Sequence, residues 1–304
     1  MKYIITGGAG FIGSECVRQL SLNPENHIYI IDKLTYAADL SRLPNNRSNI
    51  ELIEEDIVNF SRISSLVKKC DFVLHFAAES HVDNSIKNGN PFIETNVGGT
   101  FAVLEECREN NIRMVMVSTD EVYGPIQNGL ATENSPLNPS SIYSATKASA
   151  DLLCLANIKT HNQQLIITRC CNNYGSMQHA EKFIPTVIER IKNNVNIPIY
   201  GNGKNLREWI HVSDHVRAIL MLLENWRPGE IFNIGTNDRI SNIDLTKMIL
   251  KMTNGNFDLI SYVEDRKGHD FRYALNSEKI KNLIGWAPSI PLSEGLRDLI
   301  NKEI

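Results

Sequence analysis

The sequence lacks the features that mark several classes of protein. Its six cysteines include no Cys-x-x-Cys pair and no zinc-ligand spacing, so we predict neither a zinc site nor a redox dithiol. Apolar stretches such as Ala218 to Leu223 fall far short of the ~20 residues that span a bilayer. Basic and acidic residues nearly balance, at a formal charge of −4, and no repeat or low-complexity tract occurs. We therefore expect no metal, no membrane and no nucleic-acid partner.

The scarcity of paired cysteines also bears on the cellular compartment. Most cysteines lie inside apolar segments, as buried free thiols do, which is typical of a reducing compartment. The apolar start of the chain, Tyr3 to Ile5, runs into glycine before a signal-peptide core could form. Both observations favour a soluble, cytoplasmic protein.

What the chain does have is a regular alternation of strand-like and helix-like segments in its first half. The composition, 42% hydrophobic and 22% charged residues, is that of a globular protein. The short β-branched runs are apolar almost throughout, as strands buried on both faces of a parallel sheet are. This rhythm predicts an α/β fold with a Rossmann-type doubly wound parallel sheet. The predicted strands are 3–6, 28–31, 51–53, 72–76, 113–118 and 165–169, and the predicted helices are 12–22, 61–69, 91–110 and 143–161.

Beyond residue 175 the alternation loosens, and joints rich in Asn, Gly and Pro separate the elements. Helices are predicted at 181–193, 213–224 and 242–253, and strands at 197–200 and 231–234. A single core stops growing near ~250–300 residues, so a chain of 304 should hold a second unit. We predict a Rossmann domain at 1–175 with returning segments at about 209–235. A smaller mixed α/β lobe would occupy mainly 176–304.

A cluster of glycines follows the first predicted strand directly. Gly8, Gly10 and Gly13 have the G-x-G-x-x-G spacing of a dinucleotide fingerprint, and Gly7 adds a G-x-x-G-x-x-G form. Such glycines permit a tight turn and let the backbone approach a pyrophosphate at the N-terminus of the next helix. The strand before the cluster and the amphipathic helix after it favour this interpretation over an ordinary glycine turn.

Residues at the ends of the next strands extend the predicted cofactor site. Asp32 stands about 20 residues beyond the last glycine, where a carboxylate binds ribose hydroxyls, and its charge would repel a 2′-phosphate. NAD is therefore favoured over NADP. Asp56, followed by Ile57, could hold the adenine or cap a helix. The small side chains of Ala77 and Ala78 would let a cofactor lie against the backbone.

A tyrosine and a lysine stand four residues apart at the start of a predicted helix. Tyr143 and Lys147 would share one face of that helix. An ammonium group beside a phenol favours the phenolate and lowers the pKa of the tyrosine, which makes it a usable general base at neutral pH. This spacing is common by chance on amphipathic helices, but the dinucleotide fingerprint upstream favours a catalytic pair.

The fifth predicted strand ends in a hydroxyl and two acids, Thr119, Asp120 and Glu121. Ligands of open α/β sheets bind beyond the carboxyl ends of the strands, which is where these side chains would lie. Adjacent carboxylates can form a solvated turn, yet two acids in unlike environments can also divide into a protonated acid and an ionised base. Hydride transfer alone needs neither acid, whereas elimination of water needs both.

These motifs, with others along the chain, carry a resemblance to a known family. The further segments are 32–36, 77–83, 94–96, 172–175, 181–185 and 265–270. The sequence resembles extended short-chain dehydrogenases/reductases, and among them the nucleotide-sugar 4,6-dehydratases, most of all those acting on dTDP-glucose. The acid pair is the specific element, because related 4-epimerases and decarboxylases lack it. The chain departs from the family pattern at Asn84, Cys171 and Lys267, and through residues 175–180.

The resemblance implies an internal redox cycle. Tyr143, tuned by Lys147, would take the proton of the glucosyl 4-hydroxyl, to which Thr119 would hydrogen-bond, while the C4 hydride passes to NAD⁺. The 4-ketone acidifies C5, so Glu121 would remove the C5 hydrogen while Asp120 protonates the leaving 6-hydroxyl. Return of the hydride to C6 gives a 4-keto-6-deoxy sugar. The protein would thus be a hydro-lyase that retains its NAD.

The resemblance also implies the residues around each ligand. Those expected to bind NAD are Gly7, Gly10, Phe11, Ile12, Gly13, Asp32, Lys33, Leu34, Thr35, Asp56, Ile57, Ala77, Ala78, Ser80, Thr95, Tyr143 and Lys147. Those expected around the nucleotide sugar are Ser80, Thr119, Asn172, Lys182, Phe183, Tyr200, Arg207, Asn242, Arg266 and His269. A guanidinium suits phosphate oxygens, although Arg207 could instead form a surface patch with Glu208, and Arg266 an ion pair with Asp265.

Several alternatives stay open from the sequence. The substrate could carry UDP or CDP, and a 4-epimerase is disfavoured only by the acid pair. A non-catalytic sensor that binds NAD(H) and regulates a partner would not need the five catalytic candidates together. Members of the family usually dimerise through two helices, here 91–110 and 143–161, so the resemblance implies a homodimer.

Overall fold

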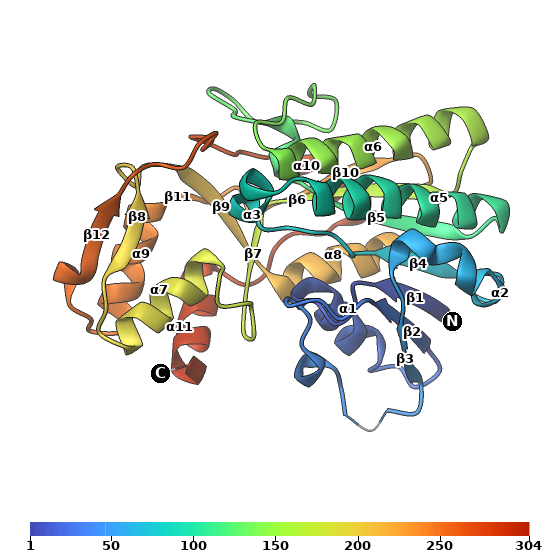
Figure 1. Cartoon of the computed structure of the whole chain (residues 1–304), viewed down its shortest axis with the longest axis horizontal. Helices are drawn as coiled ribbons and strands as arrows, with labels where there is room; N and C mark the ends of the chain where they lie inside the picture. The colour runs from blue at the N-terminus through green and yellow to red at the C-terminus, as the bar shows by residue number, and fades with distance from the viewer. Residues whose placement is uncertain (46, 304) are drawn as a thin grey trace.

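The computed structural model describes residues 1–45 and 47–303 as two lobes (Figure 1). The larger lobe is built on a seven-stranded parallel sheet in the order β10-β6-β5-β4-β1-β2-β3. Neighbouring strands β1 and β4 mark the point where the strand order reverses, which is where open α/β sheets bind ligands. The strands are β1 (Lys2–Thr6), β2 (His27–Asp32), β3 (Ile50–Glu54), β4 (Phe72–His75), β5 (Arg113–Thr119), β6 (Leu165–Cys170) and β10 (Ile231–Ile234).

Both faces of this sheet are covered, which explains why its strands are apolar almost throughout. Successive side chains of a strand point to opposite faces, so Ile5 packs in the core under α1 and α8 while Ile4 packs in the core under α5 and α6. The first face carries α1 (Phe11–Leu20) and α8 (Val212–Glu224). The second carries η2 (Ile57–Ile63), α2 (Ser64–Val67), α5 (Thr100–Glu109) and α6 (Ile142–His161).

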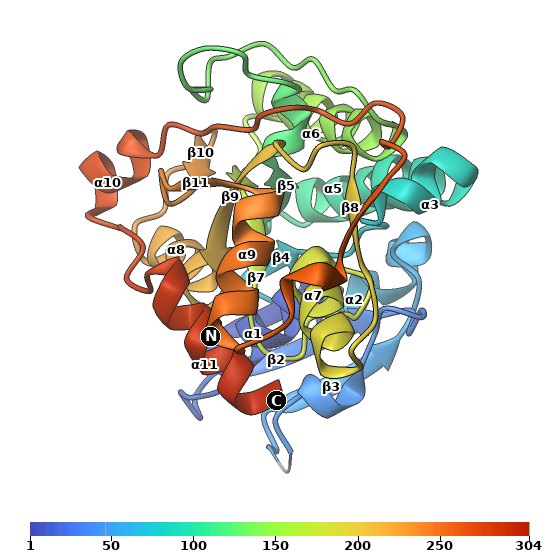
Figure 2. The same ribbon diagram turned by 90° about the vertical axis from the view of Figure 1, so that its left-hand side faces the viewer.

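The smaller lobe is a separate packing unit at the other end of the molecule (Figure 1), and it faces the viewer in Figure 2. Its core joins aliphatic side chains of α7, α9 and α11, such as Ile188, Leu250 and Leu296, to Trp209 of β9. It holds a three-stranded sheet, β11-β9-β7, and a two-stranded sheet, β12-β8. Its elements are β7 (Asn172–Tyr174), α7 (Phe183–Lys192), β8 (Ile197–Tyr200), β9 (Leu206–His211), β11 (Arg239–Ser241), α9 (Asn242–Met252), η5 (Phe257–Leu259), β12 (Ile260–Val263) and α11 (Leu292–Glu303).

The predicted fold class is confirmed, and the differences lie in two helices and several short elements. The helix predicted at 61–69 is the end of a 3₁₀ segment followed by a single α-helical turn, because Ile63 between them leaves helical geometry. The helix predicted at 91–110 contains a π-helical stretch, η3 (Ile93–Gly99), where Gly99 lies tightly against Ile57. That same helix begins with the turn α4 (Asn90–Phe92). Elements not predicted include η1 (Leu40–Arg42), α3 (Val82–Lys87), η4 (Asp120–Tyr123) and α10 (Glu278–Ile284), with β7, β9, β11, β12 and α11.

Within residues 1–45 and 47–303, every helix is too short or too polar to span a bilayer.

Candidate active site

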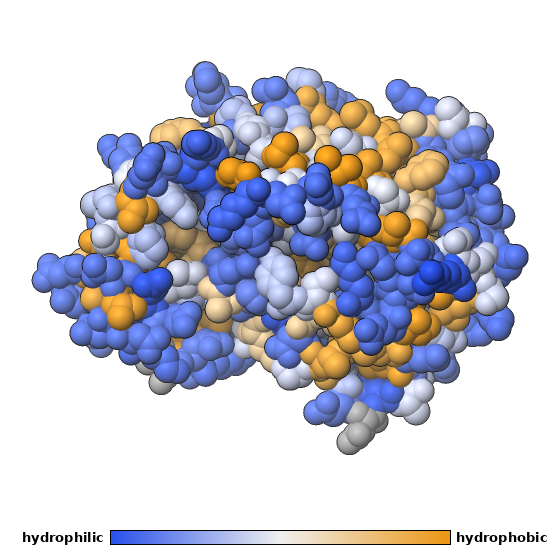
Figure 3. All heavy atoms as spheres, in the orientation of Figure 1, coloured by the Kyte–Doolittle hydropathy of each residue, from blue (hydrophilic) through white to orange (hydrophobic). Residues whose placement is uncertain are grey.

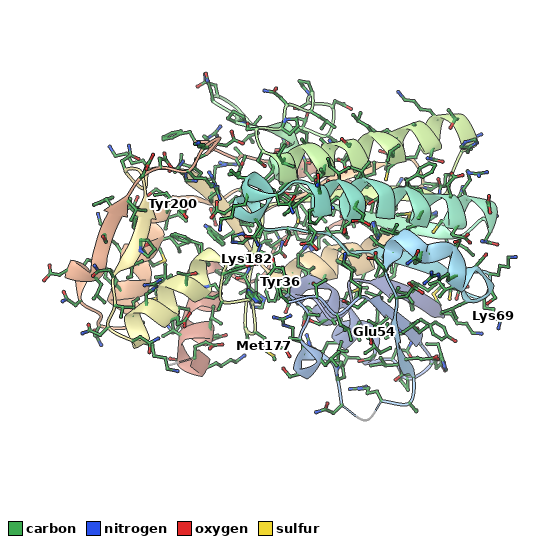
Figure 4. The ribbon with its side chains drawn as sticks, in the orientation of Figure 1. Tyr36, Glu54, Lys69, Met177, Lys182 and Tyr200 are labelled. Atoms are coloured by element: carbon green, nitrogen blue, oxygen red, sulfur yellow. The ribbon has the colours of Figure 1, made fainter. Side chains whose placement is uncertain are left out.

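A cavity of about 310 Å³ opens at the carboxyl ends of the central strands. Its walls come from the glycine cluster after β1, the ends of β2, β4, β5 and β6, the start of α6 and the segment 178–182. Figure 4 labels Tyr36 and Lys182 near the boundary between the lobes, with Tyr200 farther out on the smaller lobe. The site is therefore assembled by the larger lobe and closed by the first residues of the smaller one.

The glycine cluster forms a cradle that no side chain could share. Gly7 has φ +68°, and a Cβ there would lie 2.7 Å from the Ala77 backbone. A Cβ on Gly13 would collide with the Gly7 carbonyl oxygen. Helix α1 begins after Gly10, which supplies no capping side chain, so the first N–H groups of the helix are left for a ligand. This geometry fits the pyrophosphate of a dinucleotide.

Carboxylates and a lysine shape the other end of the cradle. Asp32 accepts hydrogen bonds from the backbone N–H groups of Ala9 (3.0 Å) and Leu34 (2.9 Å), which fix its carboxylate at the cavity wall. The Lys33 ammonium donates to Thr95 Oγ1 at 3.1 Å and lies 3.4 Å from Asp56 Oδ2. Asp56 also caps η2, so the two roles considered for it are compatible.

All but one of the residues predicted to bind the cofactor line this cavity. The exception is Leu34, which has φ +54° and contributes its backbone N–H to Asp32 rather than a wall of the cavity. The prediction of Leu34 as a cofactor contact stays a prediction, and the structure adds a role for its backbone in holding Asp32.

Tyr143 and Lys147 both reach the cavity from the first turns of α6. Ser141 caps the N-terminus of this helix and forms a capping box with Ser144. Lys147 Nζ donates to the Val117 carbonyl at 2.8 Å. The predicted lowering of the Tyr143 pKa is wrong for this structure: burial, followed by the nearby Glu121 carboxylate, raises the pKa well above its usual value. Burial likewise lowers the pKa of Lys147.

The acid pair lies on η4, directly after β5. The Thr119 hydroxyl accepts from the Glu121 N–H and donates to Asp120 Oδ1, each at 3.3 Å. Burial, and then the charge of Glu121, raises the pKa of Asp120 well above its usual value, which favours the protonated form of this acid. Burial also raises the pKa of Glu121, but the cations Arg207, Arg266 and Lys182 oppose that shift. The two acids thus differ in environment as the sequence predicts.

The residues predicted to contact the substrate fall into two groups. Ser80, Thr119, Asn172 and Lys182 line the cavity, and Lys182 Nζ donates to the Ser80 carbonyl (3.2 Å) and hydroxyl (3.4 Å). Six others belong to the smaller lobe and do not line it: Phe183, Tyr200, Arg207, Asn242, Arg266 and His269. The cavity does not test these six assignments, which stay predictions.

The cations of the smaller lobe nonetheless face the acid pair. Arg207 is buried, donates to the Asp270 carbonyl at 2.8 Å and counters the charge on Glu121. The alternative of a surface patch with Glu208 is wrong, because Glu208 is fully buried. Arg266 pairs with Asp83 at 3.4 Å across the lobe boundary rather than with its neighbour Asp265.

Gln178, His179 and Glu181 line the cavity although no role was predicted for them. Glu181 lies within 3.9 Å of three potential cations, His81, His179 and Lys182. The only signal for these residues was their place directly before Lys182. Among residues 1–45 and 47–303, no group of three His, Cys, Asp or Glu side chains has metal-binding geometry.

Comparison with known proteins places the chain in a family. The family model described as GDP-mannose 4,6 dehydratase matches residues 4–299. The chain belongs to this family. It is 44% identical to the low-salt glycan biosynthesis protein Agl12 of Haloferax volcanii, over 99% of this chain and 98% of that protein. It is 40% identical to a dTDP-glucose 4,6-dehydratase of Streptomyces niveus, over 99% of this chain and 92% of that protein.

The solved structures agree with this assignment. DesIV, a dTDP-glucose 4,6-dehydratase from Streptomyces venezuelae, was crystallised with NAD and TYD bound. It superposes with a TM-score of 0.96 at 40% identity, covering 99% of this chain and 96% of that one. The family resemblance predicted from the sequence is thereby confirmed.

Two departures from the family pattern meet at the lobe boundary. Asn84 Nδ2 donates to the Tyr36 hydroxyl at 3.4 Å, and that hydroxyl lies 3.4 Å from Glu181 Oε1. The Tyr36 ring meets His179 edge-on, with 5.6 Å between ring centroids. Met177, at φ +64°, accepts a 2.9 Å hydrogen bond from Arg42 through its carbonyl. The unusual residues therefore join the two lobes beside the cavity.

Proposed function

We propose that this chain is an NAD-dependent dTDP-glucose 4,6-dehydratase, a hydro-lyase. The observation that carries the proposal is the pair Asp120, which is buried, and Glu121, which is half-buried, two acids of unlike environment in one cavity with Tyr143 and Lys147. Dehydrogenation alone does not use a proton donor and a second base, whereas loss of water does. The dTDP-glucose 4,6-dehydratases, 40% identical over nearly the whole chain, support the same reading.

The cradle formed by Gly7, Gly10 and Gly13, with Asp32 at its far end, fits NAD. The absence of side chains leaves room for the pyrophosphate, and the Asp32 carboxylate suits ribose hydroxyls and would repel a 2′-phosphate. Bound NAD⁺ accepts the C4 hydride and later returns it to C6, and its positive charge favours the phenolate of a nearby tyrosine. DesIV, which has NAD bound, has the same fold.

In the first half of the reaction, Tyr143 takes the proton of the sugar 4-hydroxyl. Burial disfavours the phenolate, so the Lys147 ammonium beside it has to offset that cost. Thr119, hydrogen-bonded to both Asp120 and the Glu121 N–H, is placed to orient the 4-hydroxyl toward Tyr143.

In the second half, the 4-ketone acidifies the C5 hydrogen and Glu121 removes it. Asp120, held protonated by burial, gives its proton to the departing 6-hydroxyl, which leaves as water. Glu121 returns a proton to C5 as C6 receives hydride. The product is the 4-keto-6-deoxy sugar, and no external oxidant or reductant is consumed.

Lys182, Ser80 and Asn172 would hold the sugar diphosphate at the cavity, with the smaller lobe supplying Phe183, Tyr200, Arg207, Asn242, Arg266 and His269 around the nucleotide. We assign residues 1–175, with about 209–235, to the cofactor-binding unit and the remainder to the substrate lobe; within these bounds, β7 and the end of β9 belong to the three-stranded sheet of the smaller lobe. In support, β10 pairs with β6 of the large sheet and α8 packs against α1.

The test is mass spectrometry of dTDP-glucose and UDP-glucose, each incubated with the protein and no reductant. Loss of one water from dTDP-glucose at the higher rate supports the proposal. Faster loss from UDP-glucose would reassign the base, and a change of configuration at C4 without mass loss would indicate an epimerase. If neither sugar changes while NAD is bound, the dehydratase is refuted for these substrates.

We also infer that two copies associate through α5 and α6. Hydrophobic residues gather over these helices in Figure 3, and Phe101 and Leu152 are 47% and 56% exposed there. Exchanging Leu152→Glu should halve the mass found by light scattering, whereas a monomeric parent would contradict the inference.

The six free, buried thiols support a reducing, cytoplasmic location.

A further inference from the structure

A row of buried polar side chains runs from β10 to the helix that carries the catalytic tyrosine and lysine. Tyr123 donates to Asn233 Oδ1 at 2.7 Å and accepts from Arg169 Nη1 at 2.8 Å. Arg169 Nε in turn donates to Asp151 Oδ2 at 2.7 Å. The side chains of Arg169 and Asp151 are only 2% and 0% exposed, so this ion pair is sealed from solvent.

Asp151 stands one helical turn beyond Lys147 on α6, and Lys147 stands one turn beyond Tyr143. Residues four apart share a helix face, so Asp151 stands on the face of α6 that carries Lys147, one turn farther from Tyr143. The charge distribution agrees with this placement. Among the groups that act on the charge of Lys147, Asp151 contributes most, whereas Tyr143 is influenced by Glu121, Cys170 and Asp120.

The other groups around Lys147 carry no countercharge. Cys154 on α6 and Cys170 on β6 are thiols whose pKa burial raises, so they are neutral. His75 on β4 is neutral as well, because burial lowers its pKa to about 3. Asp120 and Glu121 on η4 face the phenol, and Asp120 is protonated.

Tyr143 and Lys147 can share one proton in two ways. Phenolate with ammonium is the form that accepts the substrate proton, whereas phenol with neutral amine is inert and carries no buried charge. Burial of both groups favours the inert form. A carboxylate beside the amine favours the active one. Burial raises the pKa of Asp151, and the charge and hydrogen bond of Arg169 oppose that rise and favour the ionised carboxylate.

We propose that Asp151, held ionised by Arg169, places the shared proton of the Tyr143–Lys147 pair on the lysine and so keeps the base of the enzyme in its phenolate form. Asp151 and Arg169 are thus positioning residues that act through Lys147. The proposal rests on the proposed function only for its catalytic consequence.

The test measures the phenolate absorbance of Tyr143 in the NAD-loaded protein without substrate. For the parent and for each variant, the spectrum of the same protein carrying Tyr143→Phe is subtracted as the baseline. Asp151→Asn keeps the size of the side chain but removes its charge. The ratio of phenolate to phenol, measured on its plateau at neutral pH, should fall about tenfold or more. The reason is that a nearby opposite charge shifts the pKa of an ionisable group by about 1–3 units. The turnover number should fall in proportion.

Two further variants keep the test decisive. Asp151→Asn with Arg169→Met leaves no unpaired buried charge, and such neutral replacements of buried ion pairs generally fold. Its phenolate fraction should lie between those of the parent and Asp151→Asn. Tyr123→Phe breaks the row at its far end without changing the charge beside Lys147, so it should leave the phenolate fraction unchanged.

The possible outcomes separate this proposal from the proposed function. A parental phenolate fraction in both Asp151 variants, or an equal loss in Tyr123→Phe, would show a merely structural role and overturn the proposal. If the parent converts no nucleotide sugar but Asp151→Asn still loses phenolate, the proposed function fails and this inference stands.

Discussion

Replacing the proposed acid, Asp120→Asn, should separate the two halves of the reaction. Asp120 is buried and protonated, so asparagine matches both its shape and its neutrality. Its Oδ1 can still accept from the Thr119 hydroxyl, a contact of 3.3 Å in the parent. The fold and the adjacent Glu121 should therefore persist, and the loss should be chemical.

The size of the effect follows from the role of the proton. General acid catalysis contributes about 10²–10⁴-fold, so water loss should slow by that factor, about 3–5 kcal/mol of barrier. Tyr143 and Lys147 are untouched, so oxidation at C4 should stay within about threefold of the parental rate. Reduced cofactor should then accumulate to about one equivalent per site, because its formation continues while its reoxidation waits for elimination.

The assay combines stopped-flow absorbance of the reduced nicotinamide with mass spectrometry of the sugar. Glu121→Gln is the matched control: it should also accumulate reduced cofactor, but it should stop the exchange of the C5 hydrogen with deuterated water, which Asp120→Asn should retain. Equal loss of cofactor reduction and water loss in Asp120→Asn would refute the assigned role, as would unchanged turnover.

Three further predictions concern pH, the cradle and the core. Glu121 must be ionised, and because burial raises its pKa, kcat/KM measured against pH should fall on the acid side at a pH above the ordinary carboxylate range. Gly13→Ala should weaken NAD binding at least ~10-fold in calorimetry, because its Cβ would collide with a carbonyl of the cradle. Tyr174→Phe should raise stability by ~1 kcal/mol in thermal melts, since its buried hydroxyl has no hydrogen-bond partner among the described residues. Gly295→Ala should cost ~1–3 kcal/mol by crowding that hydroxyl, and less when combined with Tyr174→Phe.

The large sheet was predictable because strands that are buried on both faces have sequences that are apolar almost throughout. Strands such as β1 and β6 are apolar almost throughout, and the glycines and Asp32 follow at the spacings that a cofactor requires. β9 has no such sequence. Its strand Leu206–His211 has two adjacent charged residues, Arg207 and Glu208, yet both are buried by partners that come from distant segments.

The site was predictable in its chemistry and less so in its energetics. Short motifs predicted that five residues would lie together: Thr119, Asp120, Glu121, Tyr143 and Lys147. Such motifs suffice because the spacing of residues along the sequence determines which of them are neighbours on one turn or one helix face. The pKa of Tyr143 depends on burial by the surrounding fold, so the pair alone indicated the wrong direction. The distance from the cavity to residues such as Tyr200 depends on how the lobes pack, which local patterns do not encode.

The most direct test of the dehydratase assignment uses dTDP-glucose carrying deuterium at C4, with no added cofactor reductant. Internal hydride transfer predicts a product that has lost one water and carries the deuterium at C6. A product that has lost water but not kept the deuterium at C6, or a sugar that stays unchanged in the presence of bound NAD, would contradict the account.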